Sequence, residues 1–310
     1  MVSMANTVDS VRRFFDGDVW YSFKRNPLVI VATIAALICM IGSVFAPWIA
    51  PHNPFDLKTL NLLDAFSPPA WTELGKPQFW LGTDDQGRDV LSTIMHGSRV
   101  SLVVGICAVF LSMAVGITLG LISGYVGGAV DAFIMRVADI QLSFPAILIA
   151  LLIDGVARAV IGKEHHDQVA VYVLIFAIAA SGWVQYARTV RGSTLVERNK
   201  EYVQAAQVIG RSSLAIMFSH VLPNVMGPVF VLATLHVGTA IITEATLSFL
   251  GVGVPPTQPS LGTLIRVGND FLFSGEWWIT VFPGLALVIL VLSINIIGDW
   301  LRDALNPKLR

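Results

Sequence analysis

Six apolar blocks constrain this chain more than any other feature, because each is long enough to cross a lipid bilayer. A spanning helix needs about 20 mostly apolar residues to cover roughly 30 Å of hydrocarbon. Charged residues make up only 13% of the 310 residues, whereas soluble domains contain about 25%. The sequence therefore predicts an all-α, polytopic membrane protein with six transmembrane helices, at residues 28–50, 100–123, 132–153, 169–186, 225–250 and 278–298.

The segment before the first block, residues 1–27, is polar and has no short apolar core followed by a small-residue cleavage site. A cleavable secretory signal would need both, so we expect the first block to remain as a membrane anchor. The third block is the weakest, because Arg136 and Asp139 fall in its first turns. These two residues are three apart and can pair on one face of a helix near the interface.

Lysine and arginine determine the expected orientation, because cytoplasmic loops of membrane proteins carry an excess of both. With the N-terminus inside, the inner segments hold 13 of these residues and the outer segments hold 7. An even number of spans then places both termini, including a tail at residues 299–310, in the cytoplasm. The net charge of −1 gives no reason to expect nucleic acid as a partner, and the two cysteines show no metal-binding spacing.

Two connections are too long to be simple turns, and loops of more than about 15 residues usually have a function or structure of their own. Residues 51–99 form a predicted outer loop that is rich in proline and tryptophan. Residues 187–224 form a predicted inner loop. In it Tyr202, Ala206 and Ile209 fall at helical spacing, and Gly210 stands where a helix would end.

After this glycine we expect a second short helix, from Ser212 or Ser213 to Val221, and a sharp turn at Pro223 into the fifth span. Ala205 and Ala206, in the first helix, have side chains small enough to let another surface approach closely. The inner loop is not strongly basic on one face, as a helix bound to lipid headgroups would be. An amphipathic connector resting on headgroups is the alternative, but we favour a helix that fits a groove on another protein.

Several motifs together resemble those of bacterial ABC-importer permeases. The run Tyr202-Val203-Gln204-Ala205-Ala206, followed by Gly210 and by Leu222-Pro223-Asn224, is similar to the EAA loop of that family. The sequence departs from the pattern at Gln204, where many relatives carry glutamate, although many peptide-type members also lack it. Residues 81–92, 123–128, 247–253 and 298–306 resemble the second permease subunit of the dipeptide, oligopeptide and nickel branch, and the likeness covers nearly the whole chain.

This resemblance implies the type I ABC importer permease fold, with a transmembrane core at residues 100–298 and a cytoplasmic coupling helix that docks an ATPase subunit. The implied partners are a homologous second permease, two ATPase subunits, an extracytoplasmic solute-binding protein and the lipid of a bacterial inner membrane. ATP and Mg²⁺ would bind to the ATPase subunits, so this chain would have no catalytic residue or cofactor of its own. It would carry short peptides or similar solutes. The docking residues would be Tyr202, Val203, Gln204, Ala205, Ala206, Gly210, Leu222 and Pro223.

Two patterns suggest sites that their context argues against. Residues 82–89 have the glycine spacing of a phosphate-binding loop, but Arg88 and Asp89 replace the lysine and the Ser/Thr that contact phosphate and Mg²⁺. We expect a turn-rich cap that either lies near the docking surface for the solute-binding protein or supports the structure. His165 and His166 fall in a predicted short outer loop, and a solvated loop is favoured there over a metal site.

Glu244 is the one clearly intramembrane carboxylate in the predicted spans. Because a carboxylate facing lipid is costly, we expect Glu244 to face the bundle interior or a wet cavity. It would either line the pathway, near a peptide's ammonium group or the partner permease, or form a structural hydrogen bond between helices. Thr243 and His236 share one face of the same helix, and Glu244 is offset from that face by about 80°. All three are pathway candidates.

Glycine recurs along the second block and just after it. Such residues allow close helix packing or bending in membranes, although glycine is also a common component of membrane helices. The chain lacks the several deep charges and internal repeats that are typical of ion-coupled secondary transporters, and it shows no catalytic constellation of a membrane enzyme. The glycines concerned are Gly116, Gly120, Gly124, Gly127 and Gly128.

Overall fold

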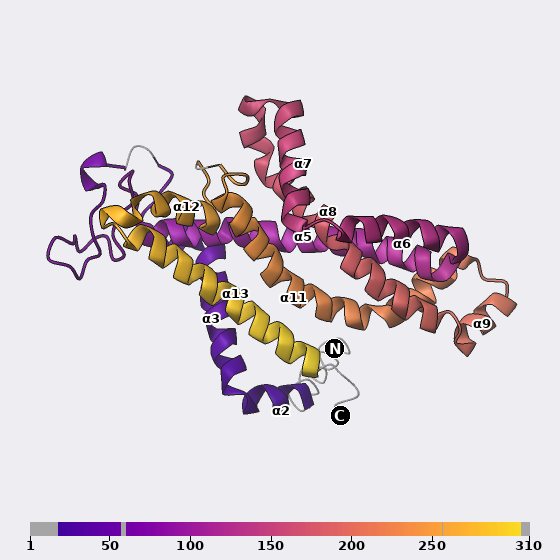
Figure 1. Ribbon diagram of the computed structural model, residues 1–310. Coiled ribbons are helices and arrows are strands. Elements are labelled where there is room, and N and C mark those ends of the chain that lie inside the picture. The colour runs from indigo at the N-terminus through magenta and orange to yellow at the C-terminus, as the bar shows by residue number, and fades with distance from the viewer. Residues whose placement is uncertain (1–17, 57–59, 256, 305–310) are drawn as a thin grey trace, which may run out of the picture.

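The computed structural model describes residues 18–56, 60–255 and 257–304, and its regular elements in these ranges are all helical. Five helical segments are long and apolar enough to cross a membrane, and the number is six if a bent pair of helices is one span, so the all-α polytopic prediction is confirmed (Figure 1). The elements are α2 (Asp18–Arg25), α3 (Pro27–Val44), α4 (Ala46–Ile49), η1 (Leu62–Asp64), α5 (Val90–Val126), α6 (Gly128–Leu142), α7 (Ala146–Ile161), α8 (Lys163–Glu197), α9 (Glu201–Val208), α10 (Ser213–Ile216), η2 (Met217–Val221), α11 (Leu222–Phe249), α12 (Leu261–Phe271), η3 (Leu272–Ser274) and α13 (Trp278–Ala304).

The predicted third span is not one continuous helix. It is divided between α6 and α7, which are bent by 93° at the break between them. Pro145 directly precedes α7; a proline lacks the amide donor and disfavours helical dihedrals in the residue before it. Figure 1 shows α7 projecting from the rest of the chain beside the first part of α8. Asp139 does not depend on Arg136 for a partner, because it accepts a hydrogen bond of 2.5 Å from Arg188 of α8.

Several helices extend beyond the predicted spans, because polar helix ends continue beyond the apolar blocks. α5 already includes residues 90–99 of the predicted outer loop, and α8 includes residues 187–197 of the predicted inner loop. α13 continues into the predicted C-terminal tail, of which residues 305–310 lie outside the description, as do residues 1–17 of the predicted N-terminal segment. The first span ends early, with a break between α3 and α4, and α12 was not predicted.

α5 is the central helix and packs against α3, α6, α8, α11, α12 and α13. Its glycines bring the backbone of α8 unusually close: a Cβ on Gly116 would lie 2.6 Å from the carbonyl oxygen of Trp183, and one on Gly124 would lie 2.7 Å from Thr194 Cβ. The predicted close packing is therefore confirmed. Gly127 and Gly128, with φ of 72° and 57°, form the turn into α6, where a side chain would strain the backbone.

The loop segment before α5 is tied to the helices by buried polar contacts. Trp278 Nε1 of α13 donates to the carbonyl oxygen of Thr83 at 3.0 Å, and Arg88 Nε donates to Asp84 Oδ2 at 2.6 Å, with both side chains buried. Asp89 accepts a hydrogen bond from the backbone N–H of Ser92 at 2.9 Å and so caps α5. This network supports the structural interpretation of residues 82–89; their docking role stays a prediction.

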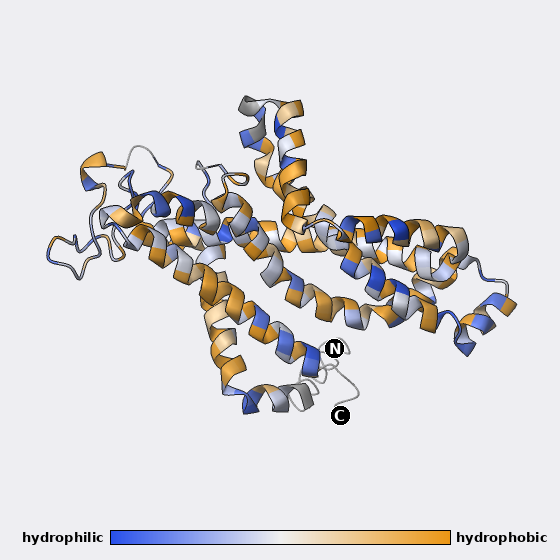
Figure 2. Cartoon of the chain, viewed as in Figure 1, coloured by the Kyte–Doolittle hydropathy of each residue, from blue (hydrophilic) through white to orange (hydrophobic). Residues whose placement is uncertain are grey.

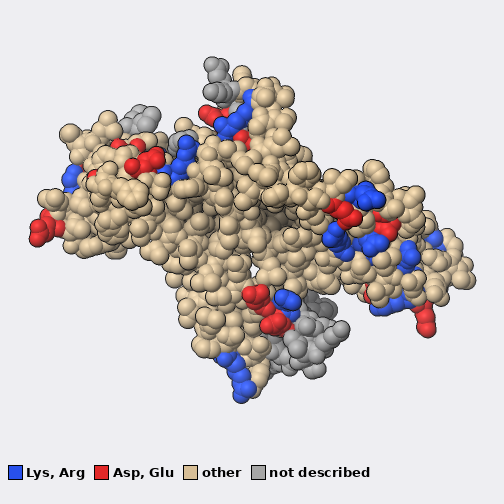
Figure 3. Space-filling view, viewed as in Figure 1, with Lys and Arg blue, Asp and Glu red and all other residues tan. Residues whose placement is uncertain are grey.

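The surface of the long helices is largely apolar, as a lipid environment requires. Figure 2 shows hydrophobic residues along the outside of α3, α5 and the first part of α13, and exposed side chains there include Ile38, Phe110 and Val288. On the face drawn in Figure 3, charged residues gather toward the extremities of the molecule and leave its middle almost free of charge. This distribution matches a chain whose middle lies in hydrocarbon and whose ends lie in water.

The contact between α5 and α8 gives a direct test of this packing. Gly120→Ala would place a methyl group against the carbonyl oxygen of Ala187 and 2.9 Å from Val190 Cβ, so we expect a loss of about 1–3 kcal/mol in stability through overpacking. Gly192→Ala on α8 is the matched control, because a Cβ there has no neighbour within 4 Å. Thermal unfolding of the purified protein in detergent measures both, and equal melting temperatures would contradict the packing.

Candidate functional site

α9, α10 and η2 form an elbow at one end of the molecule, beyond the ends of α8 and α5 (Figure 1). Gly210 has a φ of 82° and reverses the chain after α9, and the Ser212 hydroxyl accepts a hydrogen bond from the backbone N–H of Ala215 at the start of α10. The predicted short helix and glycine turn are confirmed, and the second helix begins at Ser213 as predicted but does not end at Val221.

The sharp turn predicted at Pro223 is wrong. α10, η2 and α11 run on as one helical segment, residues 213–249, with Pro223 in the first turn of α11. η2 is a π-helical turn, and the N–H of Leu222 bonds to the carbonyl oxygen of Met217, five residues back. The proline lacks an N–H, and the wider π turn accommodates that gap, so the helix continues where a break was expected.

The predicted docking residues divide between buried and exposed positions of the elbow and of the start of α11. Val203 and Ala206 are buried and pack in the core with Ile216, Met217 and Val221 of the next two elements. Gln204, Ala205, Gly210 and Pro223 are exposed, while Tyr202 and Leu222 are half-buried. Ala206 thus serves packing within this chain and is not available to a partner.

Sequence reasoning missed most of the exposed apolar surface on the elbow. Val208 and Ile209 have 89% and 79% of their surface exposed, and Leu214 and Phe218 are also exposed. We call these four residues the elbow ridge. The sequence did indicate this exposure. At 100° per residue no single helix face can hold Val208 and Ile209 together with both Val203 and Ala206. Which face is buried, however, depends on α10 and η2.

A cavity of about 350 Å³ lies between α5, α8 and α11, and Thr243 and His236 both line it. The Nε2–H of His236 donates to Gln185 Oε1 of α8 at 2.5 Å, and the His236 ring packs edge-on against Tyr186. Ser112 and Thr239 also line the cavity, whereas no charged side chain of the described residues does. The structure therefore brings two pathway candidates together and adds Gln185, which the sequence did not single out because it is uncharged.

Glu244 lies elsewhere, in the packed interior of the bundle. Its side chain has no exposed surface, and it accepts hydrogen bonds from Ser101 Oγ of α5 at 2.6 Å and from Ser248 Oγ at 2.7 Å. Ser101 in turn accepts the N–H of Leu261 at the start of α12. Glu244 thus joins α5, α11 and α12, which is the structural hydrogen bond between helices that was one of the two interpretations.

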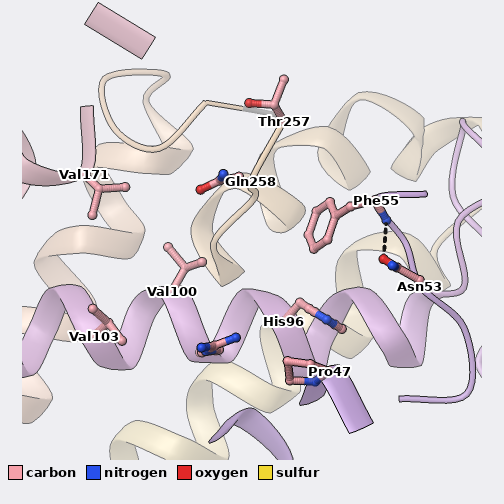
Figure 4. Close-up of a pocket in the computed structure, with 10 residues that line it drawn as sticks. Pro47, Asn53, Phe55, His96, Val100, Val103, Val171, Thr257 and Gln258 are labelled. Atoms are coloured by element: carbon pink, nitrogen blue, oxygen red, sulfur yellow. Dashed lines mark hydrogen bonds between the residues drawn. The ribbon is translucent and has the colours of Figure 1, made fainter. Parts of the chain in front are cut away.

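A larger cavity, about 590 Å³, opens at the end of the molecule opposite the elbow. Figure 4 shows His96 and Val100 of α5 on one side of it and Gln258 on the loop that precedes α12 on the other, with Phe55 beside them. None of the residues predicted for the pathway lines this cavity.

No metal site emerges in the part of the chain that the structure describes, where no three His, Cys, Asp or Glu side chains could hold one ion. The short loop predicted around His165 is wrong, because α8 begins at Lys163 and makes this segment helical. His165 is exposed, and the side chain of His166 lies outside the description.

The fold is similar to that of solved ABC importer permeases. It matches a chain of the MetNI methionine ABC transporter, in inward-facing conformations, with a TM-score of 0.53 at 17% sequence identity; the match covers 69% of this chain and 96% of that chain. A second crystal form gives the same TM-score at 20% identity. These likenesses show the type I permease fold, as the sequence predicted.

Sequence comparisons show the family. A family model described as "Binding-protein-dependent transport system inner membrane component" matches residues 116–310, and another, "N-terminal TM domain of oligopeptide transport permease C", matches residues 14–69. The dipeptide transport system permease proteins DppC of Haemophilus influenzae and Escherichia coli are 39% and 43% identical, over 94% of this chain and 95% and 93% of theirs. OppC of Bacillus subtilis, an oligopeptide transport system permease protein, is 38% identical over 94% of this chain and 90% of its own. The chain therefore belongs to the dipeptide and oligopeptide branch of the ABC permeases, multi-pass proteins of the inner membrane.

Glu244 offers a test that separates its two interpretations. Glu244→Ala leaves the hydroxyl groups of Ser101 and Ser248 without their acceptor, and we expect a loss of about 1–3 kcal/mol in stability. Glu244→Gln keeps one acceptor oxygen and should retain most of the stability and the transport activity. If Glu244→Gln were as stable as wild type but inactive in transport, the charge would act in the pathway and the structural interpretation would fail.

Proposed function

We propose that this chain is a permease subunit of a peptide importer. With a homologous second permease it forms a pathway for short peptides that a solute-binding protein delivers. Two ATPase subunits bind and hydrolyse ATP with Mg²⁺, and the elbow transmits their movement to the pathway helices. The observation that carries this proposal is the elbow ridge, an exposed apolar surface on a segment that is also anchored in the core.

The elbow ridge has the character of a protein-docking surface. Val208, Ile209, Leu214 and Phe218 expose apolar side chains on the two sides of the turn at Gly210, and large exposed apolar patches usually mark interaction sites. A short helix with one apolar face fits a groove on another protein. Lys200 is already paired with Glu197 at 2.6 Å, which weakens the case for a headgroup-binding helix.

The opposite face of the elbow makes it suitable for transmitting movement. Val203 and Ala206 pack with Met217 and Val221 in the same core cluster that contains residues of α5, α8 and α11. Because packed interiors are dense and transmit strain, a displacement of α9 would be passed to these helices and would not be absorbed locally.

The neutral cavity between α8 and α11 is our candidate for this chain's part of the pathway. His236, Gln185 and Thr243 offer hydrogen bonds but no fixed charge, and such a lining suits the amide groups that all peptides share. The names of the relatives point the same way: DppC is called a dipeptide permease and OppC an oligopeptide permease, while GsiD of Escherichia coli, a glutathione permease, is 36% identical.

The orientation follows from the same proposal. ATPase subunits work in the cytoplasm, so the elbow and both termini would be cytoplasmic. The segment before α5 would then face the solute-binding protein. Arg188 and Arg191 lie on the half of α8 that leads into the elbow, and Arg198 directly follows its last residue, as the excess of basic residues on cytoplasmic segments requires.

The docking role is tested by charge on the elbow ridge. We expect Val208→Glu and Ile209→Glu to remove the ATPase subunits from the complex when the tagged chain is purified with the products of its neighbouring genes, while the second permease still copurifies. Burying an unpaired carboxylate in an apolar interface is strongly unfavourable. Quantitative mass spectrometry of the purified complex measures the loss.

Two further variants sharpen this experiment. Phe273→Glu changes an equally exposed apolar residue near the opposite end of the molecule and should leave ATPase binding unchanged. Ala206→Arg is unsuitable as a docking test, because Ala206 is buried within the chain and its replacement would disturb the elbow itself. Wild-type protein that purifies alone and still transports solute would refute the importer-subunit proposal.

The pathway role is tested by truncating two side chains that line the cavity. We expect His236→Ala and Gln185→Ala to lower peptide transport in proteoliposomes by about tenfold each, the effect of losing one good hydrogen bond to substrate or between these two side chains. ATPase copurification should not change, because the cavity is remote from the elbow ridge. Unchanged transport in both variants would place the pathway elsewhere, and the larger cavity beside His96 would be the next candidate.

A further inference from the structure

α9 cannot hold its position by itself, because it has only eight residues. Isolated helices of fewer than about 12–15 residues are marginal in water, so its geometry depends on contacts with neighbouring elements. The apolar contacts of Val203 and Ala206 fix one face. Apolar contacts are not directional, however, and they leave open what determines where α9 sits relative to the ends of α8 and α11.

A hydrogen-bonded relay centred on Tyr202 provides that directional contact. The Tyr202 hydroxyl donates to Oε2 of Glu197, the last residue of α8, at 2.6 Å. It also accepts from Nδ2 of Asn224, in the first turn of α11, at 3.2 Å. The same Asn224 amide donates to the carbonyl oxygen of His220 at 2.7 Å, and Lys200 Nζ donates to Glu197 Oε1 at 2.6 Å.

The Tyr202 hydroxyl stays protonated at all physiological pH values. Burial and the hydrogen bond to the Glu197 carboxylate raise the pKa of Tyr202 to about 12. The hydroxyl therefore keeps its proton and can always donate to Glu197. Phenylalanine would fill the same space without either bond, so the oxygen can be removed with little change in packing.

The Tyr202 contacts and the hydrogen bond between Gln185 and His236 are separated by the same length of helix on α8 and on α11. Gln185 stands twelve residues before Glu197 on α8, and His236 stands twelve residues after Asn224 on α11. At 1.5 Å per residue, each stretch of helix is about 18 Å long. α8 and α11 are thus joined twice, by Tyr202 at the elbow and by the bond between Gln185 and His236 in the cavity.

We propose that Tyr202 is a positioning residue for coupling, not a docking contact. By bonding Glu197 and Asn224 at once, its hydroxyl fixes α9 to the ends of both helices that line the cavity. A displacement of α9 then moves α8 and α11 together. Without this hydroxyl, α9 still docks through the elbow ridge, but its movement reaches the two helices separately. The inference rests on the proposed function of the elbow and assigns a residue that joins docking to the pathway.

The test uses the full complex of this chain, the second permease, the ATPase subunits and the solute-binding protein, reconstituted in proteoliposomes with radiolabelled di- and trialanine as probes. We expect Tyr202→Phe to retain the ATPase subunits and the basal rate of ATP hydrolysis. Peptide transported per ATP hydrolysed should fall about five- to tenfold, as expected for the loss of a hydrogen-bonded link. Tyr172→Phe, an exposed tyrosine near the other end of α8, is the matched control and should behave as wild type.

Two further variants separate positioning from a general structural role. Glu197→Gln keeps an acceptor for the hydroxyl and should retain coupling, whereas Asn224→Leu removes the donor and should uncouple as Tyr202→Phe does. The double variant Tyr202→Phe/Asn224→Leu should be no worse than either single one, because residues that act as a unit are not additive. Fully additive losses would overturn the relay.

The remaining outcomes distinguish the two proposals. Wild-type coupling in Tyr202→Phe would overturn the relay and leave the proposed function intact. Loss of the ATPase subunits in Tyr202→Phe would also overturn it, because Tyr202 would then be a docking contact. A wild-type complex that neither retains ATPases nor transports the peptides would refute the proposed function, and the relay would fall with it.

Discussion

The close approach of α5 and α8 is the contact on which the other parts of this molecule depend. Gly116, Gly120 and Gly124 let the two backbones meet where any side chain would collide. In lipid, helices gain little from burying apolar surface, so small residues and close van der Waals contact decide which helices associate. This contact places the far end of α8, and with it the elbow, and it sets one wall of the cavity that Gln185 lines.

Polar contacts reinforce that packing at several junctions of the bundle. Arg191 donates to both carboxylate oxygens of Asp131, at 2.5 and 2.6 Å, and so ties α8 to the start of α6. Glu244 holds α5 and α11 together by accepting hydrogen bonds from two serine hydroxyls. One of these, Ser101, also accepts the N–H of Leu261 and so connects α12. A buried carboxylate that is fully hydrogen-bonded specifies one arrangement of helices, since any shift would leave its oxygens unpaired. The cavity beside His236, in contrast, has only neutral side chains, and the hydrogen bond between His236 and Gln185 links α8 and α11 across it.

The sequence predicted the helical class, five of the six spanning segments and the elbow's short helix and glycine turn, because long apolar blocks and a glycine after a periodic run are strong local signals. It failed where tertiary contacts override hydropathy. The bend at Pro145 was missed because the apolar run continues through it, and α12 was missed because it is short. Gln185 was missed because an uncharged residue in a span gives no warning of a cavity. The place of Glu244 followed correctly from the expense of an exposed carboxylate, but only geometry could show that it bonds to Ser101.

The elbow shows why a motif does not by itself identify contact residues. An eight-residue helix makes about two turns, so each of its faces holds only three or four side chains, and one face must be anchored in the core. In this chain Val203 and Ala206 occupy that anchoring face, so the proposed docking falls to Val208 and Ile209, outside the motif. On the same short helix, the Tyr202 hydroxyl accepts a hydrogen bond from Asn224 Nδ2 of α11. On this view the motif specifies how α9 is anchored in the core, and the exposed residues beside the motif specify which partner binds α9.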